Sequence, residues 1–262
     1  MTRTQPPELV TATHDGAVLT LTLGAPPAHA LSRAMITALH EGLSDDATDP
    51  DTKAILLHGP GRIFCAGHDM KEIARHRADP DQGRAYLRDL FEACSAMMQT
   101  LAALPKPTIA VVEGLATAGG LQLAASCDLI FATPDASVCL PGVANGGFCT
   151  TPAVAVGRMI PRKPLMELSL SGETFPADWA HRHGLFNRLY PAKTLRAQAQ
   201  AFATTLTTRH APAIAAGKAT LQRQLDLPLD QAYALATDTM LDHFMDPARI
   251  ARDLARWSTK TR

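Results

Sequence analysis

Alternating apolar and polar residues near the start of the chain predict two strands with an amphipathic helix between them. Val18–Leu23 alternates apolar residues with threonine at a period of two, which is typical of a strand. Ala54–His58 is a short apolar run that ends at a Gly-Pro-Gly turn, and we interpret it as a second strand. Between them, Ser32 can cap a helix that runs to Leu43 with its apolar residues on one face.

Strand and helix signals keep alternating over about two thirds of the chain, with no linker between them. A long helical pattern is stopped by Pro105 and Pro107, because proline has no N–H to donate. The alternation predicts an α/β fold. The predicted segments are helices over Gly83–Leu104 and Gly119–Cys127, and strands over Thr108–Val112, Leu129–Ala132 and Ser137–Leu140.

From Lys193 onward the strand signals stop and only helical patterns follow. We therefore expect two regions, a core over residues 1–192 and a helical region over residues 193–262. The helical candidates are Leu195–His210, Pro212–Leu225, Leu229–Phe244 and Pro247–Trp257.

Composition narrows the possible partners. The 262 residues are 46% hydrophobic, and the 25 basic and 25 acidic residues cancel, so neither nucleic acid nor an anionic membrane is an expected partner. The five cysteines have no C-x-x-C spacing, which favours reduced thiols and no metal site. Met1–Val10 contains Pro6, Pro7 and Glu8 and no apolar core, so we expect a cytoplasmic protein without a secretory signal.

Two glycine-bearing segments carry the candidate chemistry. Arg62–Glu72 reads RIFCAGHDMKE and Gly114–Ala124 reads GLATAGGLQLA, and each lies between an apolar strand pattern and a helical one. Unpaired N–H groups at such places stabilise an oxyanion, which suggests a thioester site. The alternative is that the glycines only allow tight turns between strands and helices.

Both segments resemble motifs of the enoyl-CoA hydratase/isomerase, or crotonase, family. The family commonly has F-x-A-G-x-D-[IL]-x-E and then G-x-[AC]-x-G-G-G-x-E-L-A, and the resemblance covers about three quarters of this chain. Gln122, Pro141–Val143 and Phe148–Pro152 look most like the group called enoyl-CoA hydratase domain-containing protein 3. Other matching segments are Pro105–Ala110, Ser126–Ala132, Leu170–Glu173 and Gly184–Arg188.

The resemblance implies a crotonase-like spiral of ββα units that binds an acyl-CoA thioester. Coenzyme A would be part of the substrate, and no separate cofactor is expected. In the family the C-terminal helices pack between subunits, so residues 193–262 would form a trimerisation region in a homotrimer or homohexamer. Fatty acid metabolism is the implied setting.

The resemblance also implies site residues. The backbone N–H groups of His68 and Gly119 would form the oxyanion hole. The His68 side chain could act on the substrate, but we favour the alternative in which it is solvated or braces its loop. Substrate contacts would come from Ala66, His68, Asp69, Met70, Lys71, Gly119 and Gly142. Asp69 would brace the first loop, and Lys71 either contacts the CoA phosphates or is an exposed lysine at a helix start. A usual CoA contact is in doubt, because Ala25–Ala30 departs from the family pattern.

Both glutamates with which hydratases of this family activate water are missing. Gln122 takes the first position and Gly142 the second, and neither can accept a proton at neutral pH. Gln122 would instead position water or substrate. Cys149 and Thr150 are candidate substitutes, because a helix starting near Pro152 would lower the pKa of the Cys149 thiol. We favour the alternative, in which Cys149 is a buried thiol and Thr150 belongs to a helix cap.

These features leave three functions open. The one we favour is an enzyme that binds an acyl-CoA thioester and stabilises an enolate-like oxyanion, with isomerisation or another enolate step as its reaction. The second is a non-catalytic acyl-CoA-binding or scaffolding oligomer. The third is a hydratase that uses Cys149, Thr150 or an unplaced carboxylate.

Overall fold

The computed structural model describes residues 8–45 and 47–258. Most of the N-terminal segment expected to lack a secretory signal, residues 1–7, lies outside the described residues. The chain divides into two compact units, and the boundary in the sequence lies between Thr208 and Arg209. The first unit extends past the boundary expected at residue 192. Its last helix, α8 (Ala192–Thr207), packs on the larger of the unit's two sheets.

The first unit contains two sheets, and strands that follow each other in the chain are divided between them. The larger has six strands in the order β1-β2-β3-β5-β7-β10, and the smaller has four in the order β4-β6-β8-β9. Among the strands of residues 8–45 and 47–258, only the β1–β2 and β8–β9 pairs are antiparallel. The larger-sheet strands are β1 (Val10–Asp15), β2 (Val18–Leu23), β3 (Ala54–Gly59), β5 (Thr108–Val112), β7 (Leu129–Ala132) and β10 (Arg188–Leu189). The smaller-sheet strands are β4 (Ile63–Cys65), β6 (Leu115–Thr117), β8 (Ser137–Cys139) and β9 (Thr174–Pro176).

Three pairs of strands that are consecutive in the chain form the successive turns of the spiral that the resemblance implied. In each pair β3–β4, β5–β6 and β7–β8, the first strand joins the larger sheet and the second joins the smaller one before the chain continues into helices. The expected α/β crotonase-like spiral of ββα units is thus confirmed. Its helical segments are α1 (Arg33–Ser44), α2 (Met70–Arg75), η1 (His76–Ala78), α3 (Arg84–Ala103), α4 (Gly119–Ala125), η2 (Pro141–Asn145), α5 (Thr150–Val156), α6 (Arg162–Ser171) and α7 (Ala177–Arg182).

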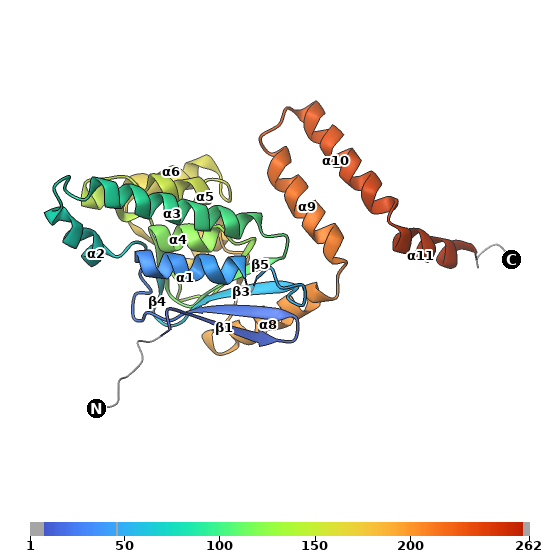
Figure 1. Ribbon diagram of the computed structural model, residues 1–262, viewed down its shortest axis with the longest axis horizontal. Helices are drawn as coiled ribbons and strands as arrows, with labels where there is room; N and C mark the ends of the chain where they lie inside the picture. The colour runs from blue at the N-terminus through green and yellow to red at the C-terminus, as the bar shows by residue number, and fades with distance from the viewer. Residues whose placement is uncertain (1–7, 46, 259–262) are drawn as a thin grey trace. The chain divides into compact units, whose positions relative to one another are not determined.

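The larger sheet is covered on both faces. Helices α1, α3 and α4 lie on one side of it and α8 on the other (Figure 1). Alternate residues of β3 separate accordingly, because Ile55 and Leu57 belong to the main core whereas Leu56 packs with Leu195 and Ala199 of α8. Burial on both faces explains why β3 and β5 are continuous apolar runs rather than alternating ones.

The second unit is helical, as expected from the loss of strand signals. It comprises α9 (Ala211–Gln224), α10 (Leu229–Phe244) and α11 (Pro247–Ser258). Helices α9 and α10 pack on each other, and the hydroxyls of Thr220 and Thr239 lie 2.8 Å apart. Across residues 8–45 and 47–258, no helix has both the length and the apolar character needed to cross a bilayer.

Candidate functional site

The first loop is held by hydrogen bonds on both sides of His68. Leu31 N–H donates to Gly67 O at 2.8 Å, and Asp69 N–H donates to Leu31 O at 3.3 Å. His68 therefore pairs with Leu31 in a parallel bridge that does not use its own N–H. Gly67 has φ +82°, a conformation that favours glycine.

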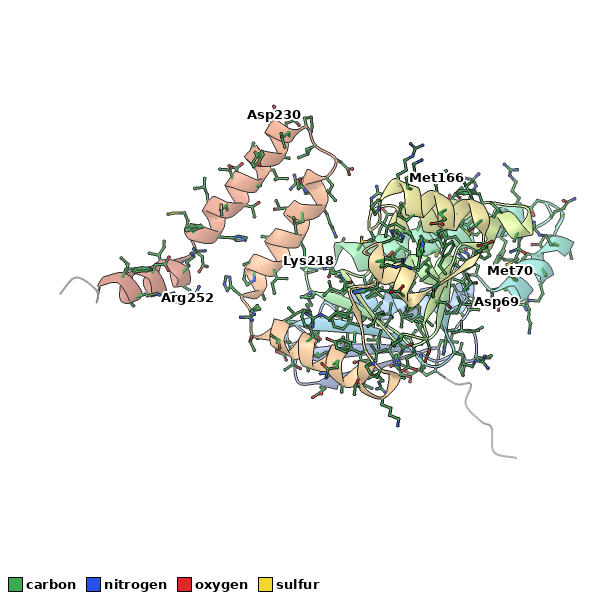
Figure 2. All side chains as sticks on the ribbon, turned by 180° about the vertical axis from the view of Figure 1, so that it is seen from behind. Asp69, Met70, Met166, Lys218, Asp230 and Arg252 are labelled. Carbon is green, nitrogen blue, oxygen red and sulfur yellow. The ribbon has the colours of Figure 1, made fainter. Side chains whose placement is uncertain are left out.

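Asp69 ends this loop and starts the next helix. Its carboxylate Oδ1 accepts the N–H groups of Lys71 at 2.8 Å and Glu72 at 3.2 Å, which caps α2. Asp69 and Met70 lie side by side at the start of this helix (Figure 2), and the Met70 side chain is 70% exposed. The Lys71 side chain is also exposed. Asp69 therefore braces the loop in the way that the sequence indicated.

The second loop turns sharply into α4. Ala118 has φ +50° although it is not glycine, and its N–H donates to Cys139 O at 3.0 Å. A non-glycine residue in this region carries backbone strain, which the surrounding structure must hold in place. Gly119 follows as the first residue of α4, so its N–H has no acceptor inside the helix.

The two loops meet at their glycines. A Cβ added to Gly67 would lie 2.8 Å from the Gly119 backbone nitrogen, and one added to Gly120 would lie 1.9 Å from Cys65 O. Among residues 8–45 and 47–258, neither the His68 N–H nor the Gly119 N–H donates to an acceptor. The predicted donors therefore lie in adjoining loops, and both remain available to an external oxygen.

The His68 side chain is not solvated in the way that the sequence suggested. Its ring packs edge-on against Phe91 of α3, with centroids 5.1 Å apart, and its Nε2 is buried without a hydrogen-bond partner. Burial lowers the pKa of His68, so the neutral imidazole is favoured.

The two positions at which the resemblance expects glutamates differ in the space they offer. Gln122 lies on α4 and is 5% exposed, and its Oε1 is buried without a partner. Gly142 lies in η2, where an added Cβ would be 2.6 Å from Cys149 N and 2.8 Å from the carbonyl carbon of Phe148. The backbone at Phe148–Cys149 thus occupies the space that a side chain at position 142 would need.

Comparison with known proteins identifies the family of this arrangement. The sequence model described as enoyl-CoA hydratase/isomerase matches residues 13–261. This chain belongs to the enoyl-CoA hydratase/isomerase family. Mouse enoyl-CoA hydratase domain-containing protein 3, mitochondrial, is 40% identical over 82% of this chain and 70% of its own length. The human protein of the same name is 38% identical over 82% of this chain and 69% of its own.

Solved structures agree with this membership. An enoyl-CoA hydratase/isomerase family protein from Silicibacter pomeroyi is 56% identical, with a TM-score of 0.86 over 91% of this chain and 100% of that one. Human enoyl-CoA hydratase domain-containing protein 3 gives a TM-score of 0.88 at 34% identity, covering 96% of this chain and 98% of that one. The expected likeness to that group is therefore confirmed.

The expected cytoplasmic location is contradicted by these relatives. The similar proteins of mouse, rat and human are all named as mitochondrial. The prediction relied on the absence of a secretory signal from Met1–Val10, and that absence does not exclude import into an organelle.

We favour the interpretation of Cys149 as a buried thiol, and the alternative, in which a helix dipole lowers its pKa, is wrong. Helix α5 begins at Thr150, so Cys149 is its N-cap, but the Cys149 side chain makes no capping hydrogen bond. Burial raises the pKa of the Cys149 thiol, a hydrogen bond with the Gly142 backbone partly offsets this effect, and the nearby Cys139 adds to it. The thiol is therefore a poor nucleophile and a poor base at neutral pH, whereas Thr150 is exposed in the first turn of α5.

The segment that departs from the family pattern, Ala25–Ala30, supports the first loop. His29 is fully buried, and its Nε2 lies 3.0 Å from Pro60 O. Ala66 N–H donates to Ala28 O at 2.9 Å, and Cys65 Sγ donates to His29 O at 3.1 Å. Sequence reasoning did not find this role, because the contacts join residues more than thirty positions apart.

Acid is expected to destabilise the fold through buried histidines. Burial lowers the pKa of His58, an effect that its 3.0 Å contact with Glu113 only partly offsets, and burial also lowers that of His68. Below about pH 6.5 the histidines of the unfolded chain bind protons more readily than those of the folded chain. The free energy of unfolding therefore decreases as the pH is lowered. Urea unfolding at about pH 8 and about pH 5.5 measures this loss.

The loss should be smaller in His58→Gln and unchanged in His14→Gln, because His14 is exposed on β1. An equal loss in wild type and His58→Gln would exclude His58 as its source.

Proposed function

We propose that this chain binds an acyl-CoA thioester with the thioester oxygen between the N–H groups of His68 and Gly119. The observation that carries the proposal is that these two donors lie in adjoining loops and have no acceptor among the described residues. Two fixed donors stabilise the charge that develops on the oxygen of an enolate, and losing one donor typically costs roughly 10²–10³ in rate. Membership of the enoyl-CoA hydratase/isomerase family supports the same substrate class.

The remaining contacts proposed for the substrate come from the same loops. Four of these contacts lie in the first loop, namely Ala66, Asp69, Met70 and Lys71. The fifth, Gly142, packs against the backbone of Phe148 and Cys149. The exposed side chains of Met70 and Lys71 suit an apolar contact with pantetheine or acyl carbons and an ionic contact with a CoA phosphate.

The proposed reaction is an enolate step, such as isomerisation, rather than efficient hydration. A general acid or base typically contributes roughly 10²–10⁴ in rate, and neither Gln122 nor Gly142 supplies one. The raised pKa of Cys149 further weakens the reading as a hydratase that uses this thiol. Gln122 would position water or substrate through its amide.

The test is to incubate the protein with enoyl-, dienoyl- and hydroxyacyl-CoA thioesters in deuterated water. Mass spectrometry then reports both a new product and deuterium at the α-carbon. Deuterium incorporation that is lost in Gln122→Leu or Gly67→Ala would support enolate chemistry at this site. Failure of every thioester to bind at sub-millimolar concentration would refute the proposal.

The second candidate is a non-catalytic acyl-CoA-binding or scaffolding oligomer. It is favoured by the absence of both glutamates and by the backbone that fills the space beside Gly142. Binding of thioesters without deuteration or product would support this candidate, whereas turnover abolished by a substitution in the site would exclude it.

We also propose that the protein is a homotrimer or a homohexamer. Support comes from large apolar side chains of the second unit that are exposed in the single chain, namely Leu221, Leu225, Leu229, Tyr233, Met240, Leu241, Met245, Leu254 and Trp257. So much exposed apolar surface is typical of a surface that another chain covers. Sedimentation equilibrium of the full chain is expected to give three or six times the mass of 28.0 kDa, and a monomer would contradict the proposal.

A further inference from the structure

The His68 imidazole borders the place proposed for the thioester oxygen. A Cβ added to Gly119 would lie 3.7 Å from His68 Cε1, so the ring lies beside the second oxyanion donor as well as on the residue that supplies the first. The edge-on contact with Phe91 fixes the ring plane at 65° to the phenyl ring. The His68 Nε2 atom is buried and has no hydrogen-bond partner among the described residues, so packing rather than a hydrogen bond of this nitrogen holds the ring.

The other ionisable groups of this region are engaged or unsuited to accept a proton. The Asp69 carboxylate caps α2, and Glu72 Oε2 accepts the Arg33 N–H at 2.9 Å. The Cys149 thiol stays protonated because burial raises its pKa. Among residues 8–45 and 47–258, the imidazole of His68 is the remaining group beside the donors, and because burial lowers its pKa its neutral form is favoured and can take a proton.

We propose that the His68 imidazole is the base that removes a proton from the α-carbon of the bound thioester. This inference rests on the proposed function, because it requires the thioester oxygen to lie between the N–H groups of His68 and Gly119. The α-carbon–hydrogen bond breaks, and the proton passes to the unprotonated ring nitrogen. The electron pair forms the enolate double bond, and the negative charge moves to the thioester oxygen between the two donors. The imidazolium then returns a proton to carbon, so no oxidant or reductant is needed.

Gln122 complements the base without replacing it. It lies three residues after Gly119, on the same face of α4, and its buried Oε1 has no donor. An amide oxygen accepts a hydrogen bond but takes no proton at neutral pH. Gln122 is therefore a positioning residue for a substrate hydroxyl or water, and the proton transfer belongs to His68.

The backbone origin of the oxyanion donor makes a clean test possible. In His68→Phe the N–H at position 68 remains, and a phenyl ring of similar shape can keep the contact with Phe91 and Gly119. α-Deuteration of butyryl-CoA in deuterated water is expected to fall by roughly 10²–10⁴ in this variant, while the Kd for butyryl-CoA changes little. His14→Gln, on an exposed strand position, serves as the control and should exchange at the wild-type rate.

A second variant keeps the test decisive if His68→Phe does not fold. His68→Ala leaves space for free imidazole, and added imidazole should restore part of the lost deuteration. Deuteration at the wild-type rate in either variant, or binding without deuteration by the wild-type protein, would overturn the role of His68. The complete absence of butyryl-CoA binding by the wild-type protein would instead refute the proposed function.

Discussion

Gly67→Ala is expected to abolish most of the acyl-CoA chemistry while the protein stays folded. The new Cβ would lie 2.8 Å from the Gly119 backbone nitrogen and 3.1 Å from the Ala118 Cβ. Relief of this clash must move one donor loop away from the other, because the nearest contact is backbone and cannot rotate aside. Displacement of an oxyanion donor costs roughly 10²–10³ in rate, and we expect at least this loss of α-deuteration.

Gly184→Ala separates this effect from backbone strain. Gly67 and Gly184 share φ +82°, so alanine pays the same conformational penalty at both positions. A Cβ on Gly184 meets nothing within 4 Å. Both variants should therefore lose about 1 kcal/mol of stability from strain, but only Gly67→Ala should lose deuteration and weaken thioester binding. Equal activity of the two variants would show that the contact between the loops does not build the site.

Local sequence signals predicted most elements because each had a strong physical cause. Ser32 accepts the Met35 N–H at 3.1 Å and begins α1, as the capping pattern indicated. Helix α3 ends at Ala103, just before Pro105, and β5 follows as the buried apolar run Thr108–Val112. The three-residue strands β4 and β6 lie within the glycine motifs, where they are too short to show a period of their own.

The sequence predicted the two loops of the candidate site, but it did not predict the burial or the pKa of the side chains in them. The motifs indicated that His68 and Gly119 carry the donors, and the structure brings their loops together. Whether the His68 ring is buried depends on Phe91, which lies in another helix and belongs to no motif. The pKa of Cys149 likewise follows from burial by distant residues, which outweighs the helix start that the sequence showed.

Positions 122 and 142, where the resemblance expects glutamates, differ in the side chain that each could hold. At position 122, where the resemblance expects a glutamate, the glutamine has a similar shape and can still form hydrogen bonds. At position 142 the backbone of Phe148 and Cys149 lies against the glycine, so a larger side chain would fit only if that segment moved. The two positions together favour a site that holds an oxyanion and a polar group over one that activates water between two carboxylates.

Gly120→Ala is expected to cause the largest loss of stability among the glycine variants. A Cβ at this position would lie 1.9 Å from Cys65 O and 2.5 Å from the Cys65 carbonyl carbon, both of them backbone atoms. Helix α4 and strand β4 would have to separate within the buried core, where overpacking typically costs about 1–3 kcal/mol and occasionally more. We expect about 3 kcal/mol or more at this position, measured as the change in the free energy of unfolding in urea.

Gly119→Ala is the matched control, because it alters the preceding residue of the same helix. Its nearest neighbour would be Leu31 Cδ1 at 3.3 Å, the end of a side chain that can shift by a few tenths of an ångström. Alanine also favours a helix over glycine by roughly 1 kcal/mol, which offsets part of that contact. The fold should therefore tolerate Gly119→Ala and not Gly120→Ala. Equal stability of the two variants would mean that α4 does not pack on Cys65, and the close approach of the two donor loops would then lose its structural basis.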